Sequence, residues 1–342
     1  VLNTGAGAAQ ISEELAAAVV HRLRRPQPVG QRNQRTGASI GVAHRDPKVT
    51  TYQAGLQMAD LALYEAKRRG RGRFVVFRPE FSEKISRRNQ IETELRAALR
   101  QHQIAPVYQQ QRSLPGRSLN GFEALARWTN PSLGPVSPAE FIPVAEEAGM
   151  IPELTSDILR TSGRTAAAWR KRGFMGRVSV NISPLLFAED VVELVQDALL
   201  QSGCPPDALE IEITEAVFLD QGQRAKEQIA RLRDMGILVA LDDFGMGYSS
   251  LSYLQKFPVD CIKIDRAFVS RMEHSDVTRK IVRAIVQMGH ALDMSVTGEG
   301  AETLDDLKHL ISAGVDTVQG YVDGKPLSFE EADRIIATEI EN

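Results

Sequence analysis

Acidic, amide and amine side chains recur where short β-branched segments of the sequence end. Such segments predict β-strands, and in a (β/α)8 barrel the carboxyl ends of the strands form one mouth, where enzyme sites are built. An acidic residue that ends a strand is usually an exposed turn or a helix cap. The unbroken series nevertheless predicts one polar site, made by Gln109, Glu123, Asn181, Glu212, Asp242 with Asp243, Lys263, Glu299 and Gln319.

Five carboxylates at one mouth require positive charge. They would repel one another, and burial would raise their pKa values unless cations were supplied. Lys263 alone cannot balance them, and the six histidines show no pair at the spacing of a zinc site. We therefore expect Mg²⁺ or Mn²⁺, with two ions in each site, because adjacent Asp242 and Asp243 suit a bridged pair of ions. Such a pair favours in-line hydrolysis of a phosphodiester.

Other chemistries account for these residues less well. The sequence has no G-x-S-x-G element of a serine hydrolase and no P-loop. The segment from Gly245 to Ser250 imitates a dinucleotide fingerprint, but a serine replaces its third glycine and two preceding aspartates would repel a pyrophosphate. A glycosidase needs two acids and would leave the other three and Lys263 without a task.

The elements that must position these side chains alternate between strand and helix. Expected strands cover 106–110, 121–127, 178–182, 209–214, 238–242, 261–264, 295–298 and 317–320, and expected helices cover 191–200, 225–235, 278–292 and 304–311. Gly203, Gly236 and Gly314 suit helix C-caps. Eight strands favour an α/β fold of the (β/α)8 TIM-like barrel type over an open sheet. Only residues 112–120, with a Pro115-Gly116 turn, join the first two strands, so we expect an antiparallel first strand.

The leading residues predict a separate small α+β unit. A strand over 38–42, a helix over 54–68 and a strand over 74–77 are its expected elements. Residues 80–100 predict a connecting helix. The expected organisation is therefore a small unit over 1–79, a connecting helix over 80–100 and the barrel domain over 101–342.

Composition and charge narrow the class of protein. The 342 residues are 43% apolar and 25% charged, as in globular proteins, and no apolar run approaches the ~18 residues of a membrane span. We expect no membrane contact from this segment. Two cysteines favour a reducing, cytoplasmic setting. The first residue is valine, so we expect that an upstream part is missing and that the segment could be the cytoplasmic part of a longer, membrane-anchored protein.

Charge is divided unevenly along the chain. Residues 1–100 carry 18 basic and 9 acidic residues, whereas the remainder carries 23 basic and 35 acidic residues. A basic segment can indicate nucleic-acid binding, but the run KRRGRGR from Lys67 to Arg73 has little aromatic interleaving. A solvated helix end explains this run better, and we expect no nucleic-acid polymer as a partner.

The strand-end motifs together resemble the EAL-domain cyclic di-GMP phosphodiesterases. The resemblance covers about Pro106 to Leu327 and is carried by GFEALARW, VNIS, EITE, DDFGMGYSSL, DCIKID, GEGAET and QGYVDGKPL. It implies hydrolysis of cyclic di-GMP to linear pGpG in a barrel with one antiparallel strand. It also implies a homodimer through the helices beside the loop that contains Ser249.

The resemblance further implies roles for individual residues. The implied metal ligands are Glu123, Asn181, Glu212, Asp242, Asp243 and Glu299. The implied catalytic residues are Glu123, Asp242, Glu299 and Lys263, which would hold the attacking water. Gln109, Arg127, Gln319 and Pro326 would contact the dinucleotide, and Glu215 and Ser249 would anchor the loop after Asp243. Two simpler interpretations stay open: Arg127 could form a structural salt bridge, and Glu302 could cap the helix that begins near Thr303.

Three positions depart from the pattern of that family without removing a ligand. Met246 stands where threonine is usual, Gln110 where proline is expected, and Ala126 where a larger apolar residue is expected. These departures concern loop dynamics and turnover. An alternative function is an EAL-type receptor that binds cyclic di-GMP without cutting it. Such receptors usually lose the glutamate of the EAL motif or a metal aspartate, and Glu123, Asp242 and Asp243 are all retained.

The leading unit resembles the last part of a GGDEF domain. SIGVA from Ser39 and ADLALYEAKRRGRGRFVVF from Ala59 are similar to its closing helix and strands. The Gly-Gly-Asp/Glu-Glu-Phe signature does not occur in this sequence. We therefore expect no cyclase activity from these residues.

Overall fold

The computed structural model describes residues 7–29, 32–34, 36–44, 51–114, 116–245 and 257–341. The chain divides into two compact units, Val1–Thr93 and Glu94–Asn342. The division falls inside helix α3 (Pro79–Arg100). Within the described ranges, no helix has both the length and the apolarity that crossing a lipid bilayer requires.

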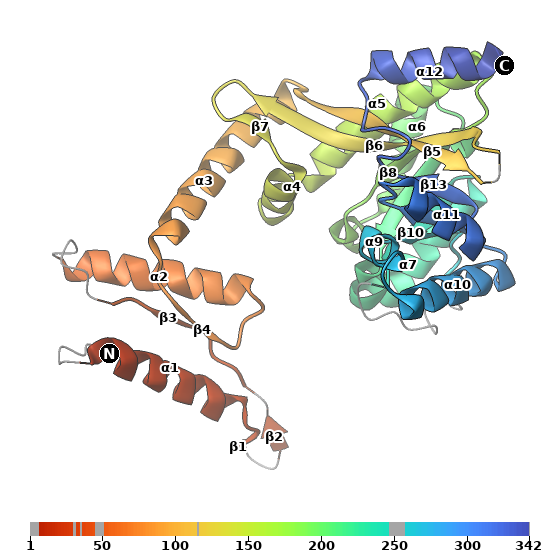
Figure 1. Cartoon of the computed structure of the whole chain (residues 1–342). Coiled ribbons are helices and arrows are strands. Elements are labelled where there is room, and N and C mark those ends of the chain that lie inside the picture. Colours follow the sequence, from red (N-terminus) through yellow and green to blue (C-terminus); the bar gives the residue numbers. More distant parts are fainter. Residues whose placement is uncertain are drawn as a thin grey trace. The chain divides into compact units, whose positions relative to one another are not determined.

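The second unit is a closed barrel of eight strands (Figure 1). The strands are β5 (Ile104–Ser113), β6 (Leu119–Asn130), β8 (Arg177–Asn181), β9 (Leu209–Thr214), β10 (Leu238–Phe244), β11 (Cys261–Ile264), β12 (Ser295–Glu299) and β13 (Thr317–Gln319). The barrel closes because β5 pairs with both β6 and β13. A short strand, β7 (Gly134–Val136), continues β6 as a hairpin outside the barrel. The predicted barrel is confirmed.

Strand β5 runs antiparallel to both of its neighbours, and the other barrel strands run parallel to one another. The short link between β5 and β6 is the cause, since a parallel crossover needs about a dozen residues or more. The predicted antiparallel first strand is therefore confirmed. Of the predicted turn, Gly116 has a left-handed φ of 104°, whereas Pro115 lies outside the described residues.

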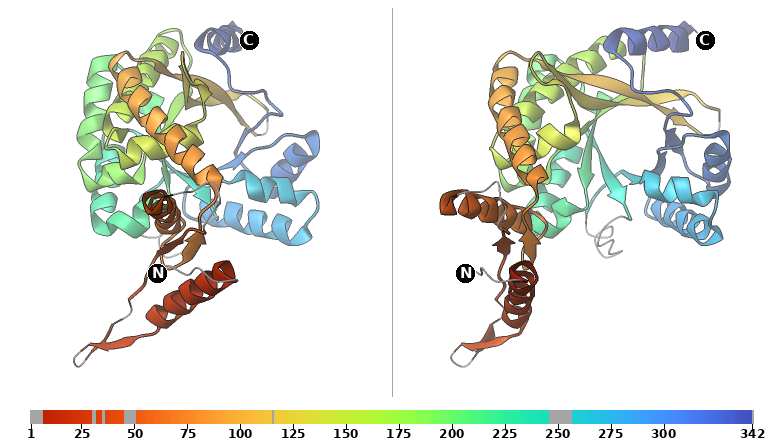
Figure 2. Two further views of the ribbon diagram at one scale, coloured as in Figure 1. Left: turned by 90° about the vertical axis from the view of Figure 1, so that its left-hand side faces the viewer. Right: turned by 60° about the vertical axis from the view of Figure 1, so that its left-hand side comes forward.

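Helices cover the outside of the barrel. Figure 2 shows α5 (Ile151–Lys171) and α6 (Val191–Ser202) in green and α10 (Asp276–Ala291) and α11 (Leu304–Ala313) in blue on opposite sides of the strands. The remaining elements are α4 (Pro138–Glu147), α7 (Ala216–Asp234), α9 (Arg266–Met272), α12 (Phe329–Glu341) and the 3₁₀ turns η1 (Pro184–Ala188) and η2 (Pro206–Ala208).

The predicted helices are present, and α7 is longer than predicted because it continues across a kink at Gly222. Gly203 and Gly314 are left-handed C-caps of α6 and α11, as predicted. They accept this conformation because they lack a Cβ. Helices α4, α5, α9 and α12 were not predicted.

The barrel strands bury apolar side chains outward and polar side chains inward. Ile211, Val239, Ile262, Val296 and Val318 are fully buried beneath the helices. The residues that alternate with them belong to the interior and include Ser179, Glu212, Lys263 and Thr297, all buried as well. Strands of parallel sheets are commonly covered on both faces. Here the inner face carries charge, which concentrates the chemistry inside the barrel.

The first unit is built on a strand–helix–strand crossover. Strand β3 (Ile40–Val42) pairs in parallel with β4 (Phe74–Val76), and α2 (Tyr52–Arg68) connects them. A Cβ on Gly41 would lie 1.9 Å from the carbonyl oxygen of Ala59, so this close strand–helix approach requires glycine. The predicted strand–helix–strand pattern is present. Helix α1 (Ala8–Arg24) and the antiparallel pair β1 (Gln27–Val29) and β2 (Arg32–Gln34) were not predicted.

Candidate functional site

The carboxyl ends of the barrel strands bring four carboxylates around one lysine. Lys263 Nζ lies 2.6 Å from both Glu212 Oε1 and Glu299 Oε1 and 3.9 Å from both Glu123 Oε2 and Asp242 Oδ1. These five side chains come from five different strands. They do not pair with one another in the register, but Glu212, Lys263 and their strand partners face the barrel interior. The five side chains meet there in what is called the layer below.

A β-bulge places Asp242 and Asp243 together at the end of β10. Leu241 pairs with Ile262 and Phe244 pairs with Ile264, so two aspartates stand opposite the single residue Lys263. Asp243 has a left-handed φ of 55°, and its N–H donates to Asp242 Oδ1 at 2.8 Å. Bulges next to active sites re-aim side chains. The bulge leaves Asp242 half-buried beside Lys263 and Asp243 exposed at the rim.

Amide side chains hold the Glu123 carboxylate. Asn181 Nδ2 donates to Glu123 Oε1 at 2.6 Å, and Gln319 Nε2 donates to Glu123 Oε2. Gln319 Nε2 also donates to Gln109 Oε1 at 3.4 Å. The three predicted amides at the strand ends are therefore joined to the carboxylate cluster.

A further amide beneath this layer was missed by the sequence analysis. Gln111 Nε2 donates to Gln319 Oε1 at 3.0 Å and to Ser179 Oγ at 3.3 Å. Because Gln111 supplies the donor, Gln319 must turn its own amide nitrogen toward Glu123. The signal was present in the sequence, since Gln111 lies two residues from Gln109 and shares its face of the strand.

The electrostatics of the layer are unbalanced. Glu212 is 0% exposed and Lys263 is 1% exposed. Burial and the nearby charge of Glu123 raise the pKa of Glu212 well above its usual range. Burial likewise raises the pKa of Glu299 to about 8, although Lys263 opposes this shift. Burial and repulsion by Asp242 raise the pKa of Asp243. The single ammonium of Lys263 thus does not provide enough positive charge to balance these carboxylates, as expected.

Two members of the layer stay charged. Burial disfavours the Lys263 ammonium, but Glu123, Glu212 and Glu299 attract it and raise its pKa well above the usual value. Burial also opposes ionisation of Glu123, yet Lys263 and the hydrogen bond from Gln319 outweigh burial and lower its pKa. The layer therefore holds an ion pair beside Glu212 and Glu299, whose ionisation is disfavoured by burial.

The donor set fits hard divalent cations. Carboxylate and amide oxygens are the ligands that Mg²⁺ and Mn²⁺ prefer. The buried Glu212 Oε2 has no hydrogen-bond partner, which is costly for an acidic oxygen and suits a cation ligand. Within the described ranges, no three His, Cys, Asp or Glu side chains are close enough to hold an ion as they stand. Lys263 lies between the acids, so a cation must compete with its ammonium.

The other predicted site residues differ in their relation to this layer. Glu215 Oε1 accepts the N–H of Gly245 at 3.1 Å, next to the end of β10. Arg127 Nη1 donates to the carbonyl of its neighbour Ala126 at 2.9 Å. Pro326 lies in the segment after β13. Ser249 and Met246 lie outside the described residues, so the loop and the homodimer expected beside it stay predictions.

Comparison with known proteins identifies both parts of the chain. Residues 92–326 match the family model "EAL domain", and residues 1–73 match "Diguanylate cyclase, GGDEF domain". Cyclic di-GMP phosphodiesterase PdeR of Escherichia coli is 35% identical over 319 residues, which are 92% of this chain and 48% of PdeR. The bifunctional diguanylate cyclase/cyclic di-GMP phosphodiesterase MucR of Pseudomonas aeruginosa is 33% identical over 319 residues, 93% of this chain and 47% of MucR. The chain spans less than half the length of these two relatives.

Solved structures show the same barrel. The structure described as "PaMucR Phosphodiesterase, c-di-GMP complex" is 34% identical, with a TM-score of 0.68 over 71% of this chain and 99% of that one. EAL enzyme Bd1971, bound to cAMP and cyclic di-GMP, is 25% identical, with a TM-score of 0.71 over 84% of this chain and 77% of that one. The predicted family is confirmed. The chain belongs to the EAL domain family, and a GGDEF-family segment precedes its EAL domain.

Proposed function

We propose that the barrel domain hydrolyses cyclic di-GMP to linear pGpG with the help of two Mg²⁺ or Mn²⁺ ions. The observation that carries the proposal is the convergence of four carboxylates, from four strands, on the ammonium of Lys263. The relatives PdeR and MucR are named as acting on this dinucleotide, and the PaMucR structure is a complex with it. Both the chemistry and the family support the same substrate.

The acids and one amide would hold the cations. The proposed ligands are Glu123, Asn181, Glu212, Asp242, Asp243 and Glu299. When bound, such cations polarise a phosphoryl oxygen and lower the pKa of a water molecule, so that it attacks at neutral pH. The bulge at Asp242 and Asp243 supports the proposal of two ions, because it places two adjacent carboxylates at the end of one strand.

The chain's own side chains would orient the reactants. Lys263 keeps its proton because the surrounding carboxylates raise its pKa, so its Nζ can donate hydrogen bonds to the attacking water. Gln109 and Gln319 would contact the dinucleotide. The Arg127 guanidinium could pair with a phosphate oxygen in a charge-assisted hydrogen bond, and Pro326 would contact the dinucleotide from the segment after β13.

Product analysis tests this proposal. Purified protein is incubated with cyclic di-GMP and either Mn²⁺ or Mg²⁺, and the nucleotides are separated by chromatography. We expect pGpG to accumulate with either ion and to disappear with excess EDTA. A Glu65→Gln protein, altered in the first unit, serves as the matched active control. Tight binding of cyclic di-GMP without any product would refute the proposal and favour the receptor function.

A further inference from the structure

The segment after β13 is held against strand β5. Residues 320–327 leave the barrel beside Gln319 and return to β5, where Tyr108 N donates to Leu327 O at 2.8 Å and Leu327 N donates to Tyr108 O at 2.9 Å. Earlier in the segment, Val322 N donates to Ala301 O at 2.9 Å. The segment carries Pro326, one of the proposed substrate contacts. The position of the segment therefore sets the position of this contact.

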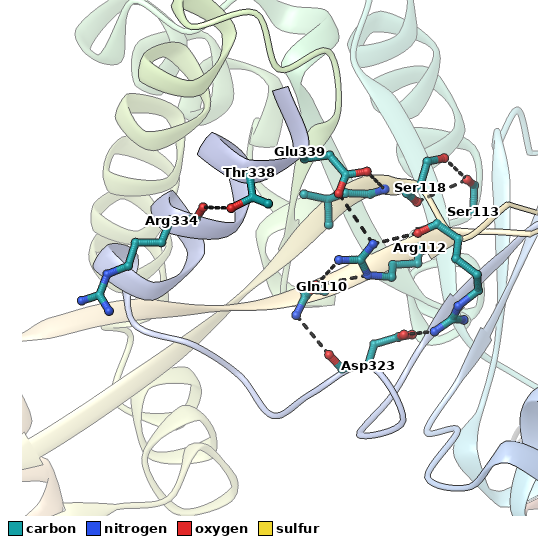
Figure 3. A network of polar contacts seen from close by, with 10 residues as sticks. Gln110, Arg112, Ser113, Ser118, Asp323, Arg334, Thr338 and Glu339 are labelled. Carbon is teal, nitrogen blue, oxygen red and sulfur yellow. Dashed lines mark hydrogen bonds and ion pairs between the residues drawn. The ribbon is translucent and has the colours of Figure 1, made fainter. Parts of the chain in front are cut away.

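The Gln110 side chain fastens the middle of this segment (Figure 3). Gln110 Nε2 donates to the Asp323 carbonyl at 3.1 Å. Gln110 Oε1 accepts from Arg112 Nε at 3.2 Å and from Arg112 Nη2 at 2.8 Å. A guanidinium has donors only, so it fixes which end of the Gln110 amide is the oxygen. The amide nitrogen is thereby left facing the Asp323 carbonyl.

A second contact holds the same point of the segment from the turn between β5 and β6. Arg117 Nη2 pairs with Asp323 Oδ1, and the Asp323 side chain is only 4% exposed. Arg112 Nη1 donates to the Arg117 carbonyl at 2.7 Å, which ties the turn to the Gln110 network. In Figure 3, Gln110 reaches Asp323, and Arg112 lies against the oxygen end of the Gln110 amide. Asp323 is thus held by a hydrogen bond to its backbone carbonyl and by an ion pair with its carboxylate.

We propose that Gln110, together with Asp323, is a positioning residue that holds segment 320–327 where Pro326 can contact the dinucleotide. The inference rests on the proposed function. The proline expected at position 110 from the family pattern has no side-chain amide and could not make this contact. The contact of Gln110 with Asp323, called the clamp below, therefore depends on this departure from the pattern. It acts on binding of the substrate, because the Gln110 side chain bonds Arg112 and Asp323 and not the Lys263 cluster that would carry the chemistry.

Amide hydrogen exchange tests whether the clamp exists. Gln110→Glu keeps the acceptor for Arg112 but sets an oxygen against the Asp323 carbonyl, where two acceptors repel. We expect exchange of the amides in 322–327 to become about five- to tenfold faster, the worth of one hydrogen bond in an equilibrium. Ser118→Ala removes a hydroxyl of the same hairpin that pairs with Ser113 and not with the segment. Exchange in 322–327 should be unchanged in that control, and unchanged exchange in Gln110→Glu as well would overturn the proposal.

Steady-state kinetics then test the positioning role. In Gln110→Glu the KM for cyclic di-GMP should rise about five- to tenfold while kcat stays within about twofold, as expected when a binding contact alone is weakened. Arg117→Met should raise KM in the same direction through Asp323. Faster exchange without any change in KM would refute the positioning role alone. Wild-type protein that neither binds nor cleaves cyclic di-GMP would instead refute the proposed function, and the exchange data would still decide the clamp.

Discussion

Buried acids in the two units of this chain differ in how much positive charge surrounds them. In the first unit, the Glu65 side chain is 8% exposed and accepts hydrogen bonds from Arg68 Nε at 3.1 Å and Arg69 Nε at 2.7 Å. Burial opposes its ionisation, but the two arginines outweigh burial and lower its pKa. In the barrel mouth, Glu212 and Glu299 share Lys263 with two further carboxylates, and the pKa of each is raised.

Charge balance separates a structural acid from an acid that needs a ligand. Glu65 finds both partners within one turn of its own helix, so the acid is satisfied by local sequence. The barrel acids come from separate strands and have too little positive charge among the described residues. Perturbed pKa values of this kind mark functional sites, although ion-pair networks also produce them. The two sets should therefore respond differently to the same kinds of substitution.

The largest expected difference is in activity. Glu123→Gln keeps the shape of the side chain but removes its charge, so a proposed metal ligand is lost. We expect hydrolysis of cyclic di-GMP to fall about a thousandfold or more, beyond the roughly 10- to 100-fold that partners outside a ligand shell cost. Glu65→Gln should retain the wild-type rate. Chromatographic rates for both proteins check this, and a Glu123→Gln enzyme near the wild-type rate would show that Glu123 binds no essential cation.

The fold was largely predictable because its signals are local. The eight strands follow from short β-branched segments, and the antiparallel β5 follows from the length of one link. Helices α1 and α5 were missed, although α5 carries a long buried face that includes Leu154, Ile158 and Trp169. The turn signal was present, because Gly173 follows the C-cap of α5 with a left-handed φ of 99°, just as Gly236 follows the C-cap of α7 with a φ of 90°. It was not used to predict α5.

The residues that meet in the site could be predicted from the sequence, but the contacts between them could not. Parallel register brings strand ends together, so the side chains that would meet could be named in advance. The approach of Lys263 to Glu212 and Glu299, and the bulge at Asp243, depend on backbone geometry that residue spacing does not contain. The Gln110 clamp was also hidden, because its partner Asp323 lies far away in the sequence and outside any strand.

A smaller difference is expected in stability. Lys263→Met leaves the mouth acids without their buried ammonium, and removing one partner of a buried ion pair costs about 3 kcal/mol or more. Arg233→Met, which breaks the half-exposed pair with Asp260 in the same unit, should cost about 1 kcal/mol or less. Urea unfolding followed by fluorescence of buried Trp128 and Trp169 measures both without added metal. Equal losses of unfolding free energy in the two variants would contradict the inference that the mouth acids depend on the buried ammonium.

Added Mn²⁺ distinguishes a loss of charge compensation from a loss of packing in Lys263→Met. If the loss in Lys263→Met arises from uncompensated carboxylates, a divalent cation should recover part of the unfolding free energy. The same ion should leave the stability of Arg233→Met, relative to wild type, unchanged. A loss in Lys263→Met that does not respond to Mn²⁺ would point to packing around the lysine stem and not to charge.

The smallest expected effect is the pH dependence of helix α2. The pKa of Glu65 is lowered from 4.5 in the folded chain, so its ion pairs contribute stability that is fully present above about pH 4.5 and is lost as the pH falls through the lower folded value. Half-exposed arginines limit this contribution to about 1 kcal/mol. Amide exchange of Tyr52–Arg68, corrected for intrinsic rates, should show a loss of protection on acidification that Glu65→Gln abolishes. Asp60→Asn, at an exposed position of the same helix, should keep the wild-type pH dependence, because this variant leaves both arginine pairs of Glu65 intact.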